Sequence, residues 1–478
     1  MRKIILLMAC VIVSIYFVCN VNVVRAFDLV DDKWSINGYA ESFPAMGLEK
    51  YDGHLVMFRN TLQLENFIKL TDEATFTAIF RGHYEGSWSA DDGLPQAPKY
   101  LDAMPDGPGM ETDATFREYY LTYSPGDFII KIGKQQLVWG EADILRLSDI
   151  INALDMSWRG FFESWEDLRR PVRMFNVVYD VPWRAAEYKI KLELIYNPED
   201  FSPTVFAPEG AFWAIPTLPP GSLDEMDREM PDKHDLRNGQ VGGRVRMNLG
   251  GWDLAAFGYY SMMEGPVFKV NPFSTKGQTP VDFYWPRIST YGGSFNFYED
   301  YTGTVFRGEF TYTRHQSFNQ IAVHPVFGPL PGIIRKNRVA YMLGFDRPCM
   351  IESLNSQRTF FVSGQLFQSF ILNADSDDNL FNTGMGKKSN SRNQTALTLL
   401  VNTEYFDAKL VPQIQGGYDF AGSGMFNPQI TYKPNWSLQF SAGVLWLWSK
   451  NSPYKYTTGI FGPFASNDQI YLRARVLF

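Results

Sequence analysis

The sequence is poor in the residues that build metal, haem and redox centres. Its 478 residues include only 3 cysteines and 5 histidines. The histidines, which show no paired zinc-binding spacing, are His54, His83, His234, His315 and His324. Cys10 and Cys19 lie in a segment that we expect to be removed, so Cys349 alone would remain and no intramolecular disulfide could form. We therefore expect neither a metal ion nor a cofactor.

Long apolar runs are also scarce. Only Ile4–Val18 forms one, preceded by Arg2 and Lys3. Val24-Arg25-Ala26 then places small residues where a signal peptidase recognises them. No later stretch approaches the roughly 18 to 20 apolar residues of a membrane-spanning helix. We predict a signal peptide over residues 1–26, cleaved after Ala26, with an uncleaved anchor helix as the alternative.

Motifs of catalysis are lacking too, and we expect no enzyme. There is no Gly-x-Ser-x-Gly elbow. Gly386-Lys387-Lys388-Ser389 looks like part of a phosphate loop, but Phe381 stands in place of its first glycine and Lys388 displaces the hydroxyl. An outer-membrane phospholipase, with Ser and His on adjacent strands, is the one catalytic alternative left open.

Basic residues are too few for a nucleic-acid partner. Loss of the signal peptide would leave 41 basic against 52 acidic side chains, a net charge of −11. Aromatic residues, in contrast, are abundant: they make up 16% of the chain, with 38 Phe and 25 Tyr. Such residues favour strands, and they also form the girdles of membrane barrels.

Apolar and polar residues alternate with a period of two in many segments, for example 188–196, 241–249 and 437–448. This period indicates strands with one apolar and one wet face. A soluble sandwich also alternates, but its strands usually have about five or six residues. Many runs here reach about ten, the length that a tilted membrane strand needs.

The pattern predicts an all-β fold: a single transmembrane antiparallel β-barrel over residues 27–478 with about 18 strands, or 16 if one hairpin is misread. Short turns alternate with long loops, which predicts short periplasmic turns and long extracellular loops. The long loops are expected at 89–111, 141–170, 198–237, 263–286, 316–334, 373–390 and 451–467. The strands are expected to begin near Trp34, His54, Ala74, Thr112, Asp127, Arg173, Tyr188, Asn238, Trp252, Arg287, Thr304, Arg335, Arg358, Arg392, Lys409, Ser423, Trp436 and Gln469.

The final strand is amphipathic and ends on Phe478. This resembles the signal by which the barrel-assembly machinery recognises outer-membrane proteins. We expect that machinery as a partner during biogenesis and the outer membrane of a Gram-negative bacterium as the location, with its lipid around the barrel.

One segment of about forty residues resembles a recurring stretch of a bacterial family, the domain of unknown function 1302, whose members are porin-like outer-membrane proteins. The residues that carry the resemblance lie between Lys131 and Asp155, within this stretch. The matching residues are Gly133, Lys134, Gln135, Trp139, Gly140, Glu141, Asn152, Leu154 and Asp155. Ala153 departs from the pattern, in which proline is commoner at this position. The resemblance implies an outer-membrane barrel, and it favours a link to export systems for hydrophobic compounds.

Charges on the polar faces of the strands are the first functional candidates, because a charged side chain facing lipid at mid-depth costs about 2–4 kcal/mol for Lys or Arg. The predicted pore-lining residues are Lys189, Lys191, Glu193, Arg244, Arg246, Arg307, Glu309, Arg473 and Arg475. A ring biased to positive charge would favour anions. The alternative is that these charges pair across strands and stiffen the wall.

The second candidate is the loop 141–170, expected to fold into the barrel mouth as a constriction. Apolar residues at helical spacing, Ile144, Leu147, Ile151 and Leu154, predict a short amphipathic helix. The charged candidates are Glu141, Asp143, Arg146, Asp149, Asp155, Arg159, Glu163, Glu166, Asp167, Arg169 and Arg170. A solvated surface loop is the alternative. The aromatic loop Pro203–Pro220 is expected to be a rigid cap, or else a gate for an apolar solute.

The function predicted from the sequence is a porin-like channel that passes small solutes by passive diffusion. One alternative is a plugged barrel that serves an exporter, or an uptake route, for hydrophobic lipid-like or aromatic compounds. Another is a structural or adhesive barrel that acts through its surface loops. The sequence leaves the oligomeric state open.

Overall fold

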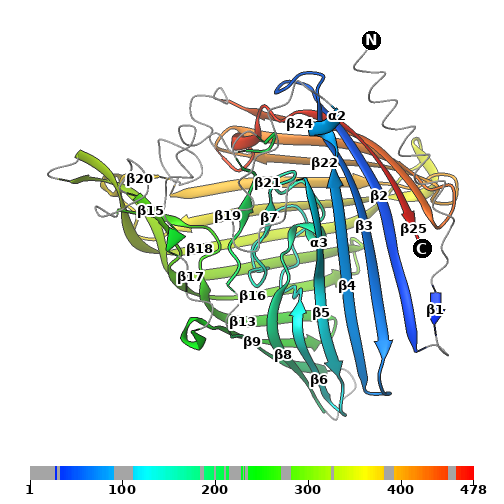
Figure 1. Cartoon of the computed structure of the whole chain (residues 1–478), viewed down its shortest axis with the longest axis horizontal. Helices are drawn as coiled ribbons and strands as arrows, with labels where there is room; N and C mark the ends of the chain where they lie inside the picture. The colour runs from blue at the N-terminus through cyan, green and yellow to red at the C-terminus, as the bar shows by residue number, and fades with distance from the viewer. Residues whose placement is uncertain are drawn as a thin grey trace.

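Eighteen long strands in the described residues form one closed wall, each antiparallel to its neighbours and paired in chain order (Figure 1). The computed structural model describes residues 27–29, 33–90, 111–182, 188–198, 201–208, 211–214, 228–229, 231, 235–270, 281–324, 328–381, 392–450 and 459–478. The strands of the wall are β2 (Trp34–Gly47), β3 (Leu55–Lys69), β4 (Ala74–Glu85), β5 (Thr112–Tyr123), β6 (Phe128–Gln135), β8 (Val172–Val181), β9 (Tyr188–Asn197), β12 (Gln240–Leu249), β13 (Trp252–Met262), β16 (Arg287–Glu299), β17 (Thr304–His324), β18 (Gly328–Ile351), β19 (Asn355–Ile371), β21 (Asn393–Asn402), β22 (Leu410–Asp419), β23 (Ser423–Tyr432), β24 (Leu438–Ser449) and β25 (Gln469–Leu477). The all-β barrel of 18 antiparallel strands is therefore confirmed.

The first and last strands of the wall close it. β2 pairs with β3 on one side and with β25 on the other, from Tyr39↔Leu477 to Gly47↔Gln469. Beyond this ladder, the backbone N–H of Phe478 donates to Gly38 at 3.0 Å, and that of Gly38 donates back at 2.9 Å. β1 (Phe27–Leu29) then pairs with the start of β2. Closure satisfies the backbone groups that an open edge would expose to hydrocarbon.

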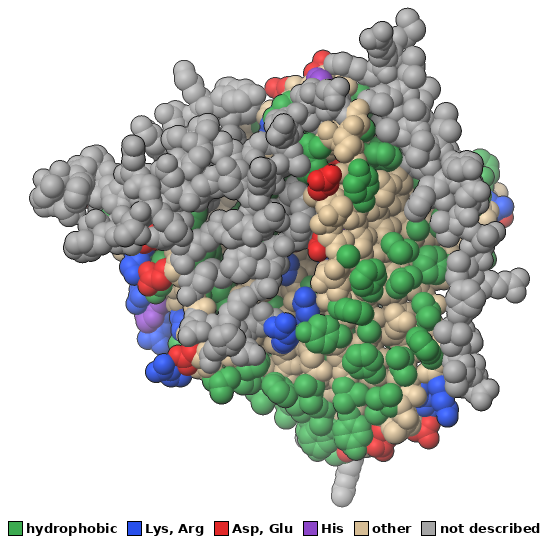
Figure 2. Space-filling model, in the orientation of Figure 1, with side chains coloured by type: hydrophobic (Ala, Val, Ile, Leu, Met, Phe, Trp, Pro, Cys, Tyr) green, Lys and Arg blue, Asp and Glu red, His purple; other side chains and the backbone are tan. Residues whose placement is uncertain are grey.

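The two faces of the wall follow the alternation in the sequence. On β9, Leu194 points outward and is 58% exposed, whereas its neighbour Glu193 points inward and is 5% exposed. Figure 2 shows hydrophobic side chains over the lower part of the wall, with acidic and basic side chains gathered at its lower edge. Among the described residues, no helix is both long and apolar enough to cross a membrane.

The prediction of a long loop over residues 316–334 is wrong. β17 continues to His324 and β18 begins at Gly328, so the two strands form a hairpin of 21 and 24 residues. A β-bulge between Thr313 and Gln316 separates its two parts. The hairpin tip lacks clear alternation, and Pro329 and Pro331 resemble strand breakers, which explains the error.

Short elements lie between the wall strands. They are α2 (Ser87–Ala90), β7 (Asp155–Met156), α3 (Trp165–Leu168), β10 (Val205–Phe206), β11 (Arg228–Glu229), β14 (Val267–Val270), β15 (Val281–Tyr284), β20 (Leu380–Phe381) and the 3-10 turns η2 (Leu236–Asn238), η3 (Ser376–Asp378) and η4 (Gly462–Phe464). β7 pairs in parallel with β10, while β11, β15 and β14 make a separate sheet. β7 and α3 belong to the segment that fills part of the barrel.

Replacing Leu194 by Arg tests the direction of the two faces. We expect the barrel to lose about 2–4 kcal/mol of unfolding free energy in lipid vesicles, because the guanidinium would face hydrocarbon. Lys191→Arg, which puts the same side chain on the inward face, should change stability by less than about 0.5 kcal/mol. Equal effects of the two substitutions, measured by denaturant unfolding, would contradict the assignment of the faces.

Candidate functional site

The segment 136–170 lies inside the barrel and contacts inward-facing residues of opposite walls. Figure 1 shows β7 and α3 between the strands β2–β5 and the strands β16–β19. Hydrogen bonds and ion pairs link the segment to β3, β4, β5, β12, β17, β19 and β25. The helix expected over Ile144–Leu154 is wrong: this stretch is irregular, and the helix of the segment is α3. The apolar residues pack against the walls without helical repetition.

Asp143 attaches one side of the segment to β17 and β19. Its carboxylate pairs with Arg307 at 2.6 Å and accepts hydrogen bonds from Gln365 at 2.9 Å and Ser363 at 3.2 Å. Arg307 also pairs with Asp346 of β18 at 2.8 Å and donates to the backbone carbonyl of Glu141 at 2.6 Å. The Arg307 side chain is only 11% exposed, so its guanidinium would be costly to leave unpaired.

Glu309 lies two residues after Arg307 on β17, on the same face of the strand, and provides the second attachment on this wall. It is 3% exposed and accepts the backbone N–H groups of Glu141 and Ser148, the latter at 2.9 Å. The hydroxyl of Ser148 donates to the same carboxylate. Arg307 and Glu309, both predicted to line the pore, thus bind the segment itself.

Glu163 attaches the other side of the segment to β3 and β25. Its carboxylate lies 3.1 Å from Arg59 and 2.9 Å from Arg473. Burial alone would raise the pKa of Glu163, but Arg59, Arg473 and Arg159 outweigh it and hold that pKa below its ordinary value. Glu163 is therefore a carboxylate held by three guanidinium groups.

Asp167 and the end of α3 bind β4 and β5. Asp167 pairs with Arg81 at 2.7 Å, and the pair of arginines Arg81 and Arg117 holds its pKa well below the ordinary value despite burial, which acts in the opposite direction. Arg117 donates to the backbone carbonyls of Arg169, at 2.8 Å, and Glu166. Ser164 caps α3 and also donates to Asp167 at 2.7 Å.

Arg159 is buried among aromatic rings. Its guanidinium lies 5.0 Å from the ring centre of Phe43 and 4.8 Å from that of Tyr471. Glu163 is 4.0 Å away. Cation–π contacts of this kind stabilise a charge that water cannot reach.

Asn152 joins the two ends of the segment. Its side-chain amide donates to the carbonyl of Arg170 at 2.9 Å, and its oxygen accepts the backbone N–H of Leu137 at 2.9 Å. Gly140 fits beside Asp149, where an added Cβ would lie 2.8 Å from the Asp149 side chain. These motif residues hold the two ends of the segment together where it leaves the wall and returns to it.

Other motif residues lie on β6 and just beyond it. Gly133 has a φ of +136°, and an added Cβ would lie 2.3 Å from the Tyr119 carbonyl, so only glycine fits. Gln135 is buried and donates to the carbonyl of Met174 at 3.3 Å across the strand pair, and Lys134 stands opposite Arg173. Their positions set how the segment leaves the wall.

Trp139 packs against the inner face of the wall at β12 and β13. Its ring lies 5.3 Å from that of Phe257 and under the guanidinium of Arg244, also at 5.3 Å. Arg244 pairs with Glu193 at 2.8 Å, and both side chains are almost fully buried. Trp139 is thus held by an arginine that is itself held by a carboxylate.

The remaining charged candidates pair in three ways. Within the segment, Asp149 pairs with Arg169 at 2.7 Å and Asp155 accepts the backbone N–H of Ser157 at 3.0 Å. Towards neighbouring loops, Arg146 pairs with Glu264, and Arg170 donates to the carbonyl of Pro203 at 2.7 Å. Arg146 also donates to the carbonyl of Asn152 within the segment. The backbone N–H of Leu154 donates to the Thr204 hydroxyl. Across wall strands, Lys191 pairs with Asp180 and Arg475 pairs with Glu41. Lys189 and Arg246 make no ion pair with another described residue.

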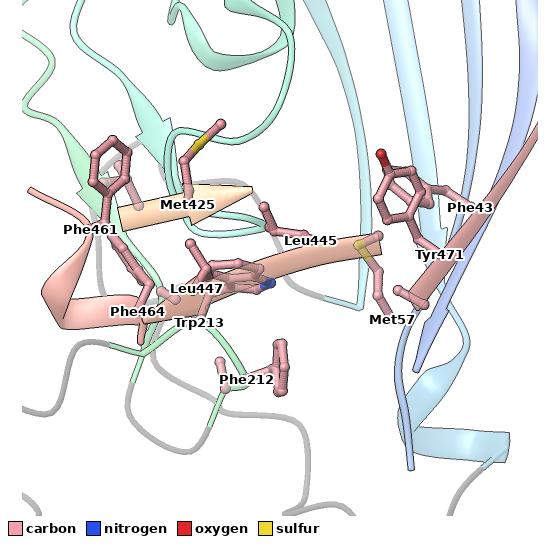
Figure 3. Packing of buried hydrophobic residues seen from close by; sticks show 14 residues of the cluster. Phe43, Met57, Phe212, Trp213, Met425, Leu445, Leu447, Phe461, Phe464 and Tyr471 are labelled. Atoms are coloured by element: carbon pink, nitrogen blue, oxygen red, sulfur yellow. The ribbon is translucent and has the colours of Figure 1, made fainter. Parts of the chain in front are cut away.

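An apolar cluster packs against the inner face of the wall near the ends of the long loops (Figure 3). Phe212 and Trp213, from the loop predicted to be a cap or gate, meet Phe461 and Phe464 from the loop before β25. Leu445 and Leu447 of β24 also point inward here, so the inner wall is apolar at this depth. The loop 203–220 lies inside the barrel where it is described.

Lys50 holds this aromatic loop. Its ammonium donates to the backbone carbonyl of Phe212 at 2.7 Å and lies 5.7 Å from the Phe212 ring centre. Asn467 donates to the same carbonyl. Burial lowers the pKa of Lys50 from 10.5 to about 8. Lys50 has no signature in the sequence, because a lone lysine in a short loop belongs to no pattern.

The wall partners Arg59, Arg81 and Arg117 were also missed. Alternation along β3 and β4 places Arg59 and Arg81 on the inward face, which was a usable signal. For Arg117 there was none, because a β-bulge between Ile79 and Phe80 shifts the register of β4 and β5 beside it. A bulge of one residue reverses which face a side chain takes.

A closed antiparallel barrel with an apolar outer face and a charged lumen defines the class of outer-membrane, porin-like β-barrels. The family model for DUF1302, a protein of unknown function, matches residues 47–478, and the chain belongs to this family. No curated protein sequence matches the chain.

Solved structures of outer-membrane channels resemble it at low identity. OpdK of Pseudomonas aeruginosa with vanillate is 9% identical, with a TM-score of 0.47, and 94% of this chain aligns with 99% of that one. OccAB3 of Acinetobacter baumannii is 9% identical, with a TM-score of 0.49 over 93% of this chain and 98% of that one. OmpF of Salmonella typhi in complex with daunomycin is 9% identical, with a TM-score of 0.42 over 95% and 100%. The fold assignment rests on the strand pairing of this chain itself.

Asp143→Ala should loosen the segment from the β17–β19 wall. It removes the acceptor of three wall donors, which costs about 1–2 kcal/mol because the Asp143 side chain is 40% exposed and solvent screens its charge. We expect faster amide hydrogen exchange in residues 139–150, with exchange in the wall strands unchanged. Unaltered exchange in this stretch would show that the Asp143 contacts do not hold it.

The contact between Lys50 and the aromatic loop should strengthen as pH rises from about 8 to 10.5. In this window the docked state binds fewer protons than an undocked one, whose lysine keeps its ordinary pKa of 10.5. Exchange protection of residues 211–214, corrected for the intrinsic rate, should increase with pH in the wild type and stay flat in Lys50→Met. A rise of the same size in the variant would assign the effect to other groups.

Proposed function

We propose that this protein is a porin-like channel through which small solutes diffuse across the outer membrane, with the segment 136–170 as its constriction. The observation that carries the proposal is the attachment of this segment to opposite walls, by Asp143 on one side and by Glu163 and Asp167 on the other. A barrel of 18 strands is wide enough to leave an aqueous lumen. A charged segment fixed across that lumen narrows the path and sets its selectivity.

The same proposal includes export by a signal peptide over residues 1–26 that is then cleaved. These residues lie outside the described part of the chain. The proposal also includes insertion by the barrel-assembly machinery, which would recognise a C-terminal signal that contains Phe478. Outer-membrane lipid and a small solute are the partners. The proposal involves no catalytic step, no cofactor and no nucleic acid.

A second candidate is a plugged barrel that assists the export or uptake of hydrophobic compounds, together with exporter components. The apolar cluster around Trp213 and Phe464 favours it, because the lumen there offers aromatic surface in place of charge. The two candidates differ in ion conduction, because in a plugged barrel the apolar cluster would close the lumen to ions.

Single-channel recording in planar bilayers tests the channel. We expect stable conductance from the purified protein, and an increase of about twofold or more when residues 157–167 are replaced by a short Gly-Ser linker, because the narrowest section widens. A matched control shortens the tip of the β17–β18 hairpin and should leave conductance unchanged. If the folded protein shows no conductance, with or without the linker, the channel is refuted and the plugged barrel is favoured.

A further inference from the structure

We propose that the arginine-lined cavity between α3 and the strands β3, β4 and β5 is a binding site for a small dicarboxylate, and that Glu163 and Asp167 occupy this site as internal substitutes for the ligand. The inference rests on the proposed channel and names its class of solute.

The cavity lies in the lumen between the segment and the wall. Its volume is about 90 Å³, room for only a few water molecules. Arg59, Arg81 and Arg117 line it from three consecutive strands, and Trp158 lies beneath the Arg59 guanidinium at 4.8 Å. A larger anion fits only when the carboxylates of the segment withdraw.

The arginines have more donors than the segment satisfies. Each guanidinium has five N–H donors. The Nε atoms of Arg59 and Arg117 and one Nη atom of Arg81 are buried without a hydrogen-bond partner in the described part of the chain. Arg117 meets only backbone carbonyls there and forms no ion pair with a described carboxylate. Such unsatisfied groups are rare in native interiors and call for another acceptor.

Charge balance favours a ligand with two carboxylates. Glu163 and Asp167 pair with different arginines: Glu163 with Arg59 and Arg473, and Asp167 with Arg81. A monocarboxylate that displaced both would leave a buried guanidinium unpaired, which is costly, whereas a dicarboxylate restores both contacts. Asp113 and Asp155 also line the cavity and would repel a third negative charge.

The exchange requires only a local movement. α3 has four residues, and Gly160, with a φ of +55°, precedes it. The attachments made by Asp143 and Asn152 lie outside this stretch and hold the rest of the segment in place. Displacing residues 163–168 breaks the contacts of Glu163 with Arg59 and Arg473 and of Asp167 with Arg81, and a dicarboxylate places one carboxylate at each of the two vacated positions.

Calorimetry on the purified full-length barrel tests the site, with glutarate as the dicarboxylate, butyrate as the monocarboxylate and glutaramide as the neutral analogue. We expect glutarate alone to bind. The double variant Glu163→Gln/Asp167→Asn should bind it about tenfold more tightly or better, because the competing carboxylates are gone. Arg81→Gln should abolish binding, while Arg287→Gln, which removes a guanidinium bound to carbonyls on another wall, should not change it.

Equal affinity for glutarate and glutaramide, or no gain in the double variant, would overturn the proposal. Should the double variant fail to fold, the loss in Arg81→Gln against Arg287→Gln decides the matter. Conductance recorded on the same preparations separates this inference from the channel: a conducting barrel that ignores glutarate refutes the site alone, and a silent barrel that binds glutarate refutes the channel alone.

Discussion

A strand that crosses hydrocarbon cannot leave a backbone N–H or C=O group unpaired, and every other feature of this molecule depends on that constraint. It forces the sheet to close, which β2 and β25 do. Closure gives each strand one face in lipid and one in the lumen, so apolar and polar residues must alternate. The charged side chains excluded from lipid then gather inside, where they need partners.

The segment 136–170 supplies many of those partners. Its carboxylates and carbonyls meet arginines of opposite walls. Its own arginines Arg169 and Arg146 meet carboxylates of the segment and of a neighbouring loop, and Arg170 meets the carbonyl of Pro203. Buried ion pairs add little net stability compared with apolar packing, but a broken one is costly. Their effect here is therefore mainly on placement: one position of the segment satisfies all of them. The lumen consequently has a defined narrow section whose charge the segment and the wall share.

Much of this arrangement was predictable from local patterns. Ten-residue alternation located all eighteen strands, and most of their starts are within two residues, as at Trp34, Ala74 and Gln469. Two predictions failed for physical reasons. Residues 316–334 pair as two strands, but their sequence does not alternate between apolar and polar residues as the lipid-facing strands do. Hydropathy therefore gave no sign of strands there. The apolar spacing of Ile144–Leu154 imitated a helix, but these residues contact separate walls and have no helical partner face.

The sequence by itself determined that the chain alternates, that its charges avoid lipid, and that residues 131–155 carry the pattern of a porin-like family. Only the tertiary structure decided which charge meets which. Arg473 and Glu163 are 310 residues apart, and Asp143 and Gln365 are 222 apart. Such pairs follow from barrel closure and from the bulges that set each strand's register. A local pattern carries no information about them, because it describes a side chain's face and not the group opposite.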